Sequence, residues 1–191
     1  MQLPVILVGN KLDIVELAIQ EEQNHTHVRD ILKRLTSQFR QIQMGIECSA
    51  YYDRNVKAVL NCAQRAVLYP LTPLYNLRSK DITPKFKRAL IRIFRILDKD
   101  MDGKLSDQEL ATLQERVFKN ELNADDIRVI KEMIHRELEE IHEEHITFDG
   151  FLTLHKKCIE MLKIQISWSI LRYFRYTNDL KLITSDEKFF L

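Results

Sequence analysis

The chain has 191 residues, 45% of them hydrophobic and 30% charged, a composition typical of a globular protein with one large or two small domains. Its 29 Lys and Arg residues nearly balance its 28 Asp and Glu residues, so net charge gives no reason to expect a nucleic-acid partner. No stretch approaches the roughly 20 apolar residues that span a bilayer, and the first residues do not read as a secretory signal. The three cysteines lack metal-ligand spacing and are expected to be reduced thiols of a cytosolic protein.

Strands and helices alternate in the N-terminal part. Leu3–Gly9 is a continuous apolar run that ends in glycine, which predicts a strand covered on both faces. Apolar residues at helical spacing predict a helix over 28–42 and another over 56–67, with a short strand over 46–50 between them. This order is typical of an α/β layer fold, and we assign residues 1–69 to it.

Proline marks the end of that domain. Residues 70–84 contain three of the four prolines and are interpreted as a linker. Beyond the linker the apolar pattern is helical throughout, so residues 85–163 are expected to form an all-α domain. Its helices, with one that follows it, are expected over 86–97, 110–118, 127–141, 147–162 and 164–174.

One segment between two helical stretches carries oxygen-bearing side chains at fixed intervals. Ca²⁺ is a hard cation, and EF-hand loops supply its oxygen ligands from positions 1, 3, 5, 7, 9 and 12, with glycine at position 6. That glycine is Gly103. An acidic solvated loop would need neither the glycine nor the final glutamate at these spacings. The predicted ligands, in order, are Asp98, Asp100, Asp102, the backbone carbonyl of Lys104, Ser106 through a water molecule, and Glu109 as a bidentate carboxylate.

A second loop is expected to pair with the first one. EF-hand loops usually meet through a short β bridge at position 8, which is Leu105 here, and Ile146 is the candidate partner. In that second loop positions 1, 3, 5 and 12 would be Glu139, Ile141, Glu143 and Gly150. Because position 12 offers no carboxylate, we expect a hidden EF-hand that keeps the fold and does not bind the ion.

The first predicted strand runs into a motif with the chemistry of guanine recognition. In Asn-Lys-x-Asp, the carboxylate of Asp13 can accept hydrogen bonds from N1–H and the exocyclic amine of guanine, which adenine does not offer. The amide of Asn10 supports the base edge and its loop, and the stem of Lys11 lies along the ring and sugar. The position of the motif after an apolar strand strengthens this interpretation.

A second element of the same site follows the next predicted strand. In GTP-binding proteins a Ser-Ala-Lys turn here offers a backbone amide to the guanine oxygen. The corresponding residues are Ser49, Ala50 and Tyr51. The amide of Ala50 survives the replacement of lysine by tyrosine, but the packing around the base changes.

A guanine-reading half-domain joined to an EF-hand pair by a short proline-containing linker resembles the mitochondrial Rho GTPases (Miro). The resemblance covers essentially the whole chain. It rests on residues 10–13, 47–50, 63–70, 73–75, 89–94, 150–155 and 168–174.

The resemblance implies a partial parallel sheet of the phosphate-loop GTPase type, followed by the EF-hand pair, with Ca²⁺ and with GTP or GDP and Mg²⁺ as ligands. Residues 164–191 would be a helix that packs against the EF-hand pair like a bound ligand, and a tail. Members of this family are anchored in the mitochondrial outer membrane and face the cytosol. They bind motor-adaptor proteins and take part in mitochondrial transport and distribution.

The sequence also departs from that family. A complete member begins with a phosphate-binding loop and two switch regions, and it continues into a second EF-hand pair, a second GTPase domain and a membrane-spanning tail. We therefore expect a fragment, cytosolic by itself, that covers the C-terminal part of the first GTPase domain and the first EF-hand pair. We assign no catalytic residue, and whether the chain hydrolyses GTP stays open. The alternative interpretation is a non-catalytic calcium sensor with a vestigial GTPase half.

Overall fold

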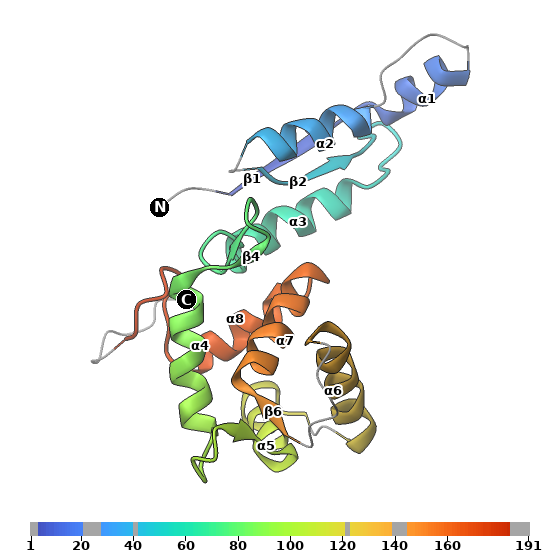
Figure 1. The fold of residues 1–191 in the computed structure, drawn as a ribbon. Coiled ribbons are helices and arrows are strands. Elements are labelled where there is room, and N and C mark those ends of the chain that lie inside the picture. The colour runs from blue at the N-terminus through green and yellow to red at the C-terminus, as the bar shows by residue number, and fades with distance from the viewer. Residues whose placement is uncertain (1–3, 21–27, 40–41, 121–122, 139–144, 184–191) are drawn as a thin grey trace. The chain divides into compact units, whose positions relative to one another are not determined.

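The computed structural model describes residues 4–20, 28–39, 42–120, 123–138 and 145–183 (Figure 1). The chain divides into two compact units, Met1–Leu71 and Thr72–Leu191. The first combines strands with helices and the second is mainly helical, as the sequence predicts. The sheet of the first unit has two described strands, so a sheet of the GTPase type stays a prediction.

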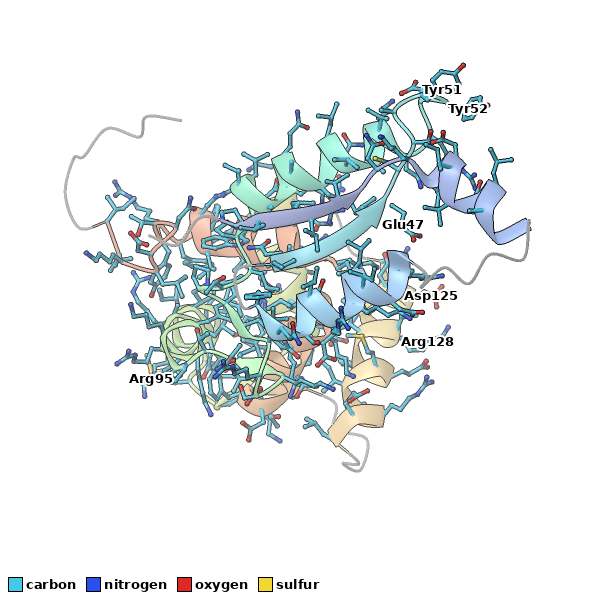
Figure 2. The ribbon with its side chains drawn as sticks, turned by 90° about the horizontal axis from the view of Figure 1, so that it is seen from above. Glu47, Tyr51, Tyr52, Arg95, Asp125 and Arg128 are labelled. Carbon is cyan, nitrogen blue, oxygen red and sulfur yellow. The ribbon has the colours of Figure 1, made fainter. Side chains whose placement is uncertain are left out.

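Two parallel strands form the centre of the first unit. β1 (Val5–Gly9) pairs with β2 (Ile42–Glu47), and Gly9 lies opposite Glu47 at the end of the ladder. α2 (Val28–Gln38) and α3 (Val56–Leu68) cover opposite faces of this pair (Figures 1 and 2). Because the strands are parallel, the loops that follow them leave from the same edge of the sheet.

A glycine allows α2 to pack directly on β2. A Cβ atom placed on Gly45 would lie 2.9 Å from the Cβ atom of Leu32, closer than real Cβ atoms approach one another. Leu32 is buried against the sheet. Only a residue without a side chain permits this distance between helix and strand, which makes Gly45 a packing requirement of the first unit.

Three elements of the first unit differ from the sequence prediction. The helix expected over 28–42 ends at Gln38, and Ile42 begins β2 instead. β2 therefore covers residues 42–47, whereas the sequence predicts a strand over 46–50. Residues 42, 44 and 46 alternate with less apolar neighbours, and this period of two was masked because Ile42 also continues the helical spacing. Residues 12–20 form a helix, α1 (Leu12–Gln20), that the sequence analysis did not predict.

The second unit begins with a small hairpin and a strongly amphipathic helix. β3 (Tyr75–Asn76) pairs antiparallel with β4 (Asp81–Ile82), so the stretch expected to be a linker contains ordered structure. α4 (Pro84–Leu97) begins directly after the hairpin. Thr83 caps it by accepting a hydrogen bond from the Phe86 amide. Proline occupies the first turn, where no amide donor is needed.

Two short strands follow, and each leads into a helix. β5 (Lys104–Leu105) precedes α5 (Asp107–Phe118), and β6 (Ile146–Thr147) precedes α7 (Phe148–Glu160). Leu105 pairs with Ile146 in an antiparallel ladder, which confirms the predicted pairing of the two loops. The remaining elements are α6 (Ala124–Leu138) and α8 (Ile164–Tyr173).

Aromatic side chains from α4, α7 and α8 build the core of this unit. Phe86, Phe151 and Trp168 are fully buried, and burial of each such side chain stabilises the fold by about 1.5–3 kcal/mol. Trp168 lies on α8, the helix that the resemblance described as packing like a ligand, and α8 contacts both α7 and α5. The apolar residues of α8 are thus explained by burial in the core of the second unit.

One polar pair is buried inside that core. Nδ1 of His155 lies 2.9 Å from Oγ of Ser167, joining α7 to α8. The ring also meets Phe151 and Phe86 edge-on, with centroids 4.7 and 5.7 Å away. Burial among these rings lowers the pKa of His155 to about 3, because the charged imidazolium would lose its hydration.

Candidate functional site

Three carboxylates converge at the end of α4. Asp98 caps the helix, and one side-chain oxygen from each of Asp98, Asp100 and Asp102 lies within 4.8 Å of the other two. Backbone amides hold them in place: Gly103 donates to Oδ2 of Asp98 at 3.1 Å, and Lys104 donates to Oδ1 of Asp102 at 2.7 Å. The loop thus brings together the three aspartates that the sequence analysis assigned as ligands.

Two residues in the left-handed backbone region give the loop its curvature. Met101 has a φ of 60° and Gly103 a φ of 81°. No atom lies within 4 Å of a Cβ atom placed on Gly103. Glycine is therefore favoured there by the backbone conformation and not by lack of space.

Glu109 closes the loop from the first turn of α5. Its carboxylate accepts hydrogen bonds from the amides of Lys99 (2.8 Å) and Ser106 (2.9 Å) and from the hydroxyl of Ser106 (2.9 Å). Ser106 in turn caps α5, so the two residues form a capping box. Burial alone would raise the pKa of the Glu109 carboxyl, but these hydrogen bonds outweigh it and lower the pKa.

The donor set fits a hard divalent cation. Oδ1 of Asp98 is buried and has no hydrogen-bond partner among the described residues, which leaves this carboxylate oxygen without compensation for its lost hydration. The sequence predicts as ligands oxygens of Asp98, Asp100, Asp102 and Glu109, the carbonyl of Lys104 and, through water, Ser106. Of these, the structure groups the three aspartate carboxylates, while the Glu109 carboxylate is bound to Lys99 and Ser106. The Ser106 hydroxyl itself donates to the Glu109 carboxylate as part of the capping box.

The second loop has its end where the sequence analysis expected it, without the glutamate. Gly150 lies in the first turn of α7, and its amide donates to the Thr147 hydroxyl at 3.1 Å. A Cβ atom on Gly150 would lie 3.1 Å from methyl groups of both Ile134 and Ile146, so a longer side chain would disturb the core. The other expected positions of this loop, Glu139, Ile141 and Glu143, lie outside the described residues.

A second cluster lies where β1 and β2 end. The hydroxyl of Ser49 donates to Oδ1 of Asp13 at 2.5 Å, and it accepts a hydrogen bond from the Tyr52 amide at 3.3 Å. Ser49 is buried, and its turn is closed by a bridge to Arg54. The structure therefore brings together Asp13 and Ser49, which are separated by 36 residues in the sequence.

Asn10 holds the two loops together. Its Oδ1 accepts hydrogen bonds from the amides of Lys11 (2.8 Å) and Ala50 (3.1 Å) and lies 3.6 Å from Sγ of Cys48. The amide of Ala50, expected to face the guanine oxygen, is thus bound to Asn10 in this geometry. Lys11 is exposed, with a φ of 64° that turns the chain into α1.

Sequence reasoning missed the role of Ser49 as the partner of Asp13. The motif assigned Ser49 to the second turn, but its contact depends on strand pairing. Next to it, Tyr51 is 83% exposed and Tyr52 is 68% exposed, with ring centroids 4.8 Å apart in an edge-to-face arrangement (Figure 2). Two large aromatic rings therefore stand in solvent directly beside Ser49.

Comparison with known proteins decides the relationship. Proteins named Mitochondrial Rho GTPase 1 and Mitochondrial Rho GTPase 3, both from Arabidopsis thaliana, are each 35% identical to the chain over 182 residues, which is 95% of the chain. The chain is a homologue of the mitochondrial Rho GTPases. Mitochondrial Rho GTPase 1 of Mycosarcoma maydis is 34% identical over 207 aligned residues, covering 94% of the chain. The resemblance recognised from the sequence motifs is thereby confirmed.

The matched segment is a part of those relatives. The chain spans about a quarter of their length, 27% in each of the three. A family model described as EF hand associated also matches residues 120–187. This match covers α6, α7 and α8, and it is consistent with an EF-hand-related domain in the second unit. None of the helices described here is long and apolar enough to cross a membrane.

Proposed function

We propose that residues 98–109 bind Ca²⁺ and that the second unit is an EF-hand pair, with residues 85–163 holding one ion-binding loop and one hidden loop. The observation that carries the proposal is that the Asp98, Asp100 and Asp102 carboxylates lie within 4.8 Å of one another, with a buried oxygen of Asp98 that has no partner among the described residues. Without a cation, three converging carboxylates repel one another, and a bound Ca²⁺ would offset that cost.

Binding would rearrange the end of the loop. The Glu109 carboxylate now accepts three hydrogen bonds from Lys99 and Ser106. As a bidentate ligand it would have to exchange part of these bonds for the ion, and α5 begins in this very turn. Ca²⁺ would therefore act on the start of α5, which gives the loop a means of signalling to the rest of the unit.

Terbium luminescence and calorimetric titration test this proposal. Glu109→Gln removes one carboxylate oxygen but keeps a side chain able to form the capping box. We expect this variant to bind Ca²⁺ weaker by about two orders of magnitude or more. Glu115→Gln, an exposed glutamate of the same helix, is the matched control and should bind as the wild type does. If the two variants bound Ca²⁺ with equal affinity, the assignment of residues 98–109 as the binding loop would be wrong.

We further propose that Asn10, Lys11, Asp13, Ser49 and Ala50 hold a guanine base. The support is the geometry of Asp13, whose carboxylate is fixed by a short hydrogen bond from Ser49 at the edge where both strands end. A carboxylate held in this way can accept two donors from guanine and none from adenine in the same positions. Mg²⁺ and the phosphates would be bound by residues other than these.

Substitution of Asp13 tests the base specificity. Asp13→Asn exchanges an acceptor for a donor and should invert the preference from guanosine to xanthosine diphosphate, because xanthine carries an oxygen where guanine carries its exocyclic amine. Calorimetry with both nucleotides measures this exchange. Asp30→Asn, an exposed aspartate of α2, is the control. A wild type that does not distinguish guanine from adenine would support the alternative, a calcium module with a vestigial GTPase half.

At the level of the whole protein, we propose a calcium-responsive GTPase of the mitochondrial surface that takes part in mitochondrial transport and distribution. The names of its relatives support the GTPase and the organelle. Location at the cytosolic face of the outer membrane, GTP hydrolysis and binding of motor-adaptor proteins are proposals that rest on the resemblance. Pull-down of mitochondrial motor adaptors with the chain, with and without Ca²⁺, measures the last of these.

A further inference from the structure

α4 separates its side chains into an apolar face and a cationic face. The helix contains five lysine or arginine residues and neither aspartate nor glutamate, although the whole chain is nearly neutral. Its apolar residues are buried in the core of the second unit. They are Phe86, Ala89, Leu90, Ile93, Phe94 and Leu97. The charge of α4 is therefore concentrated on the side away from the core.

Four of the cations form a continuous stripe. Lys85, Arg88, Arg92 and Arg95 follow one another at intervals of three or four residues, which places them on one side of a helix. All four are exposed, and the stripe extends for about 15 Å along the helix axis. Figure 2 shows the side chain of Arg95 extending away from the ribbon of α4.

Among the described residues, these cations lack the counter-charges that other cations of the unit have. On the other helices Lys131 pairs with Asp107, and Lys157 pairs with Glu137 and Glu160. In the described part of the chain, Lys85, Arg88 and Arg95 form no ion pair. Arg92 lies over the ring of Tyr176, 5.8 Å from its centroid. Within the part of the chain that the structure describes, Lys85, Arg88 and Arg95 thus remain available to an anionic partner.

Exposed apolar side chains accompany both ends of the stripe in the chain. At its C-terminal end Ile96 is 46% exposed, and Tyr173, the last residue of α8, is exposed to the same extent. Before α4, the turn of the β3–β4 hairpin carries the exposed residues Leu77, Arg78 and Lys80. Cations alternating with a few exposed apolar groups are typical of surfaces that contact lipid headgroups.

We propose that the cationic face of α4, defined by Lys85, Arg88, Arg92 and Arg95, docks on an anionic phospholipid bilayer. The face is the outer side of a single helix and offers only cations along its centre, whereas a peptide helix needs apolar anchors that enter a groove. A layer of headgroups needs only charge on a convex surface. Docking of this face would orient the second unit at a membrane surface and would not itself require a membrane-spanning helix.

Vesicle co-sedimentation of the full 191-residue chain tests this inference. The vesicles are phosphatidylcholine alone or phosphatidylcholine with phosphatidylserine, in EGTA so that calcium does not bridge protein and lipid. We expect binding only to the anionic vesicles, and weaker binding at high salt because the charges are screened. Fluorescein-labelled polyglutamate serves as a second probe, for an acidic protein partner.

Charge variants assign the binding to this face. Lys85→Gln, Arg88→Gln and Arg95→Gln together should weaken anionic-vesicle binding by about 100-fold, at about fivefold per cation. Glutamine keeps the helix propensity, and unchanged circular dichroism and Trp168 fluorescence would show that the fold is intact.

The matched control neutralises three exposed cations of the first unit, Arg29, Lys33 and Lys57, and should keep most of the affinity. Binding that survives in the α4 triple variant, or binding to polyglutamate but not to vesicles, would overturn the proposal.

Discussion

The carboxylate of Glu109 accepts a 2.8 Å hydrogen bond from the backbone amide of Lys99, so the last position of the loop, 12, is tied to position 2. The same carboxylate completes the capping box with Ser106. These contacts hold Glu109 at the start of α5, and a bound cation would have to replace part of them. The affinity for Ca²⁺ would then reflect the difference between the ion's attraction and these hydrogen bonds.

Removal of the helix cap should destabilise the ion-free second unit. Ser106→Ala loses the hydroxyl that accepts from the Glu109 amide and donates to its carboxylate. We expect the free energy of unfolding to fall by about 1 kcal/mol. Urea unfolding followed by Trp168, the single tryptophan and a fully buried one, reports this unit. Ser106→Thr keeps a hydroxyl and should lose much less; equal losses would contradict a capping role.

An added methyl group at Gly45 should disturb the first unit. Gly45→Ala would place a Cβ atom 2.9 Å from that of Leu32, so α2 must move away from β2. Such overpacking costs about 1–3 kcal/mol. Circular dichroism should show an earlier loss of structure, while Trp168 fluorescence, in the other unit, should be unaffected. Gln43→Ala on the same strand is the control, and a Gly45→Ala variant as stable as wild type would mean that the helix has room to shift.

Loss of the Ser49 hydroxyl should weaken guanine binding without changing the ligand groups themselves. In Ser49→Ala, Asp13 loses the 2.5 Å hydrogen bond that orients its carboxylate. We expect guanosine diphosphate to bind about fivefold to tenfold more weakly, as one hydrogen bond to a charged group would give. Calorimetry measures the change. Ser37→Ala, at an exposed serine of α2, controls for hydroxyl loss, and an unaltered affinity of Ser49→Ala would remove the positioning role.

Acid should destabilise the second unit through His155. Its pKa is about 3 in the folded unit because of burial, against about 6.5 when unfolded. Below pH 6.5 the unfolded chain therefore binds a proton that the folded unit does not. Stability should fall as the pH drops from about 6.5 toward 3, by up to about 1.4 kcal/mol per pH unit.

Urea unfolding followed by Trp168 at several pH values measures this slope. His155→Gln removes the titrating group and should flatten that part of the pH dependence, although it lowers stability at neutral pH. His135→Gln, on α6, is the matched control for loss of a histidine. A slope that persists in His155→Gln would assign the acid sensitivity to other groups.

Local spacing is what the sequence by itself determined. A short loop fixes the relative positions of its residues, so the aspartates at 98, 100 and 102 lie together. Gly103 supplies the positive φ that the same loop needs. The pairing of Leu105 with Ile146 was also predictable, because two loops of known length align at one position. The resemblance that these motifs indicated is confirmed by 35% identity over 95% of the chain to a protein named Mitochondrial Rho GTPase 1.

Tertiary structure alone decided the contacts that join distant segments. The bond of Ser49 to Asp13 needs parallel strands that bring two loops to one edge. The start of β2 at Ile42 could not be predicted, because Ile42 satisfies helical and strand periodicities equally and only its pairing with Val5 distinguishes them. That Lys85, Arg88 and Arg95 form no ion pair with any described residue is likewise a property of the fold, since a sequence shows where cations are and only packing shows which of them find partners.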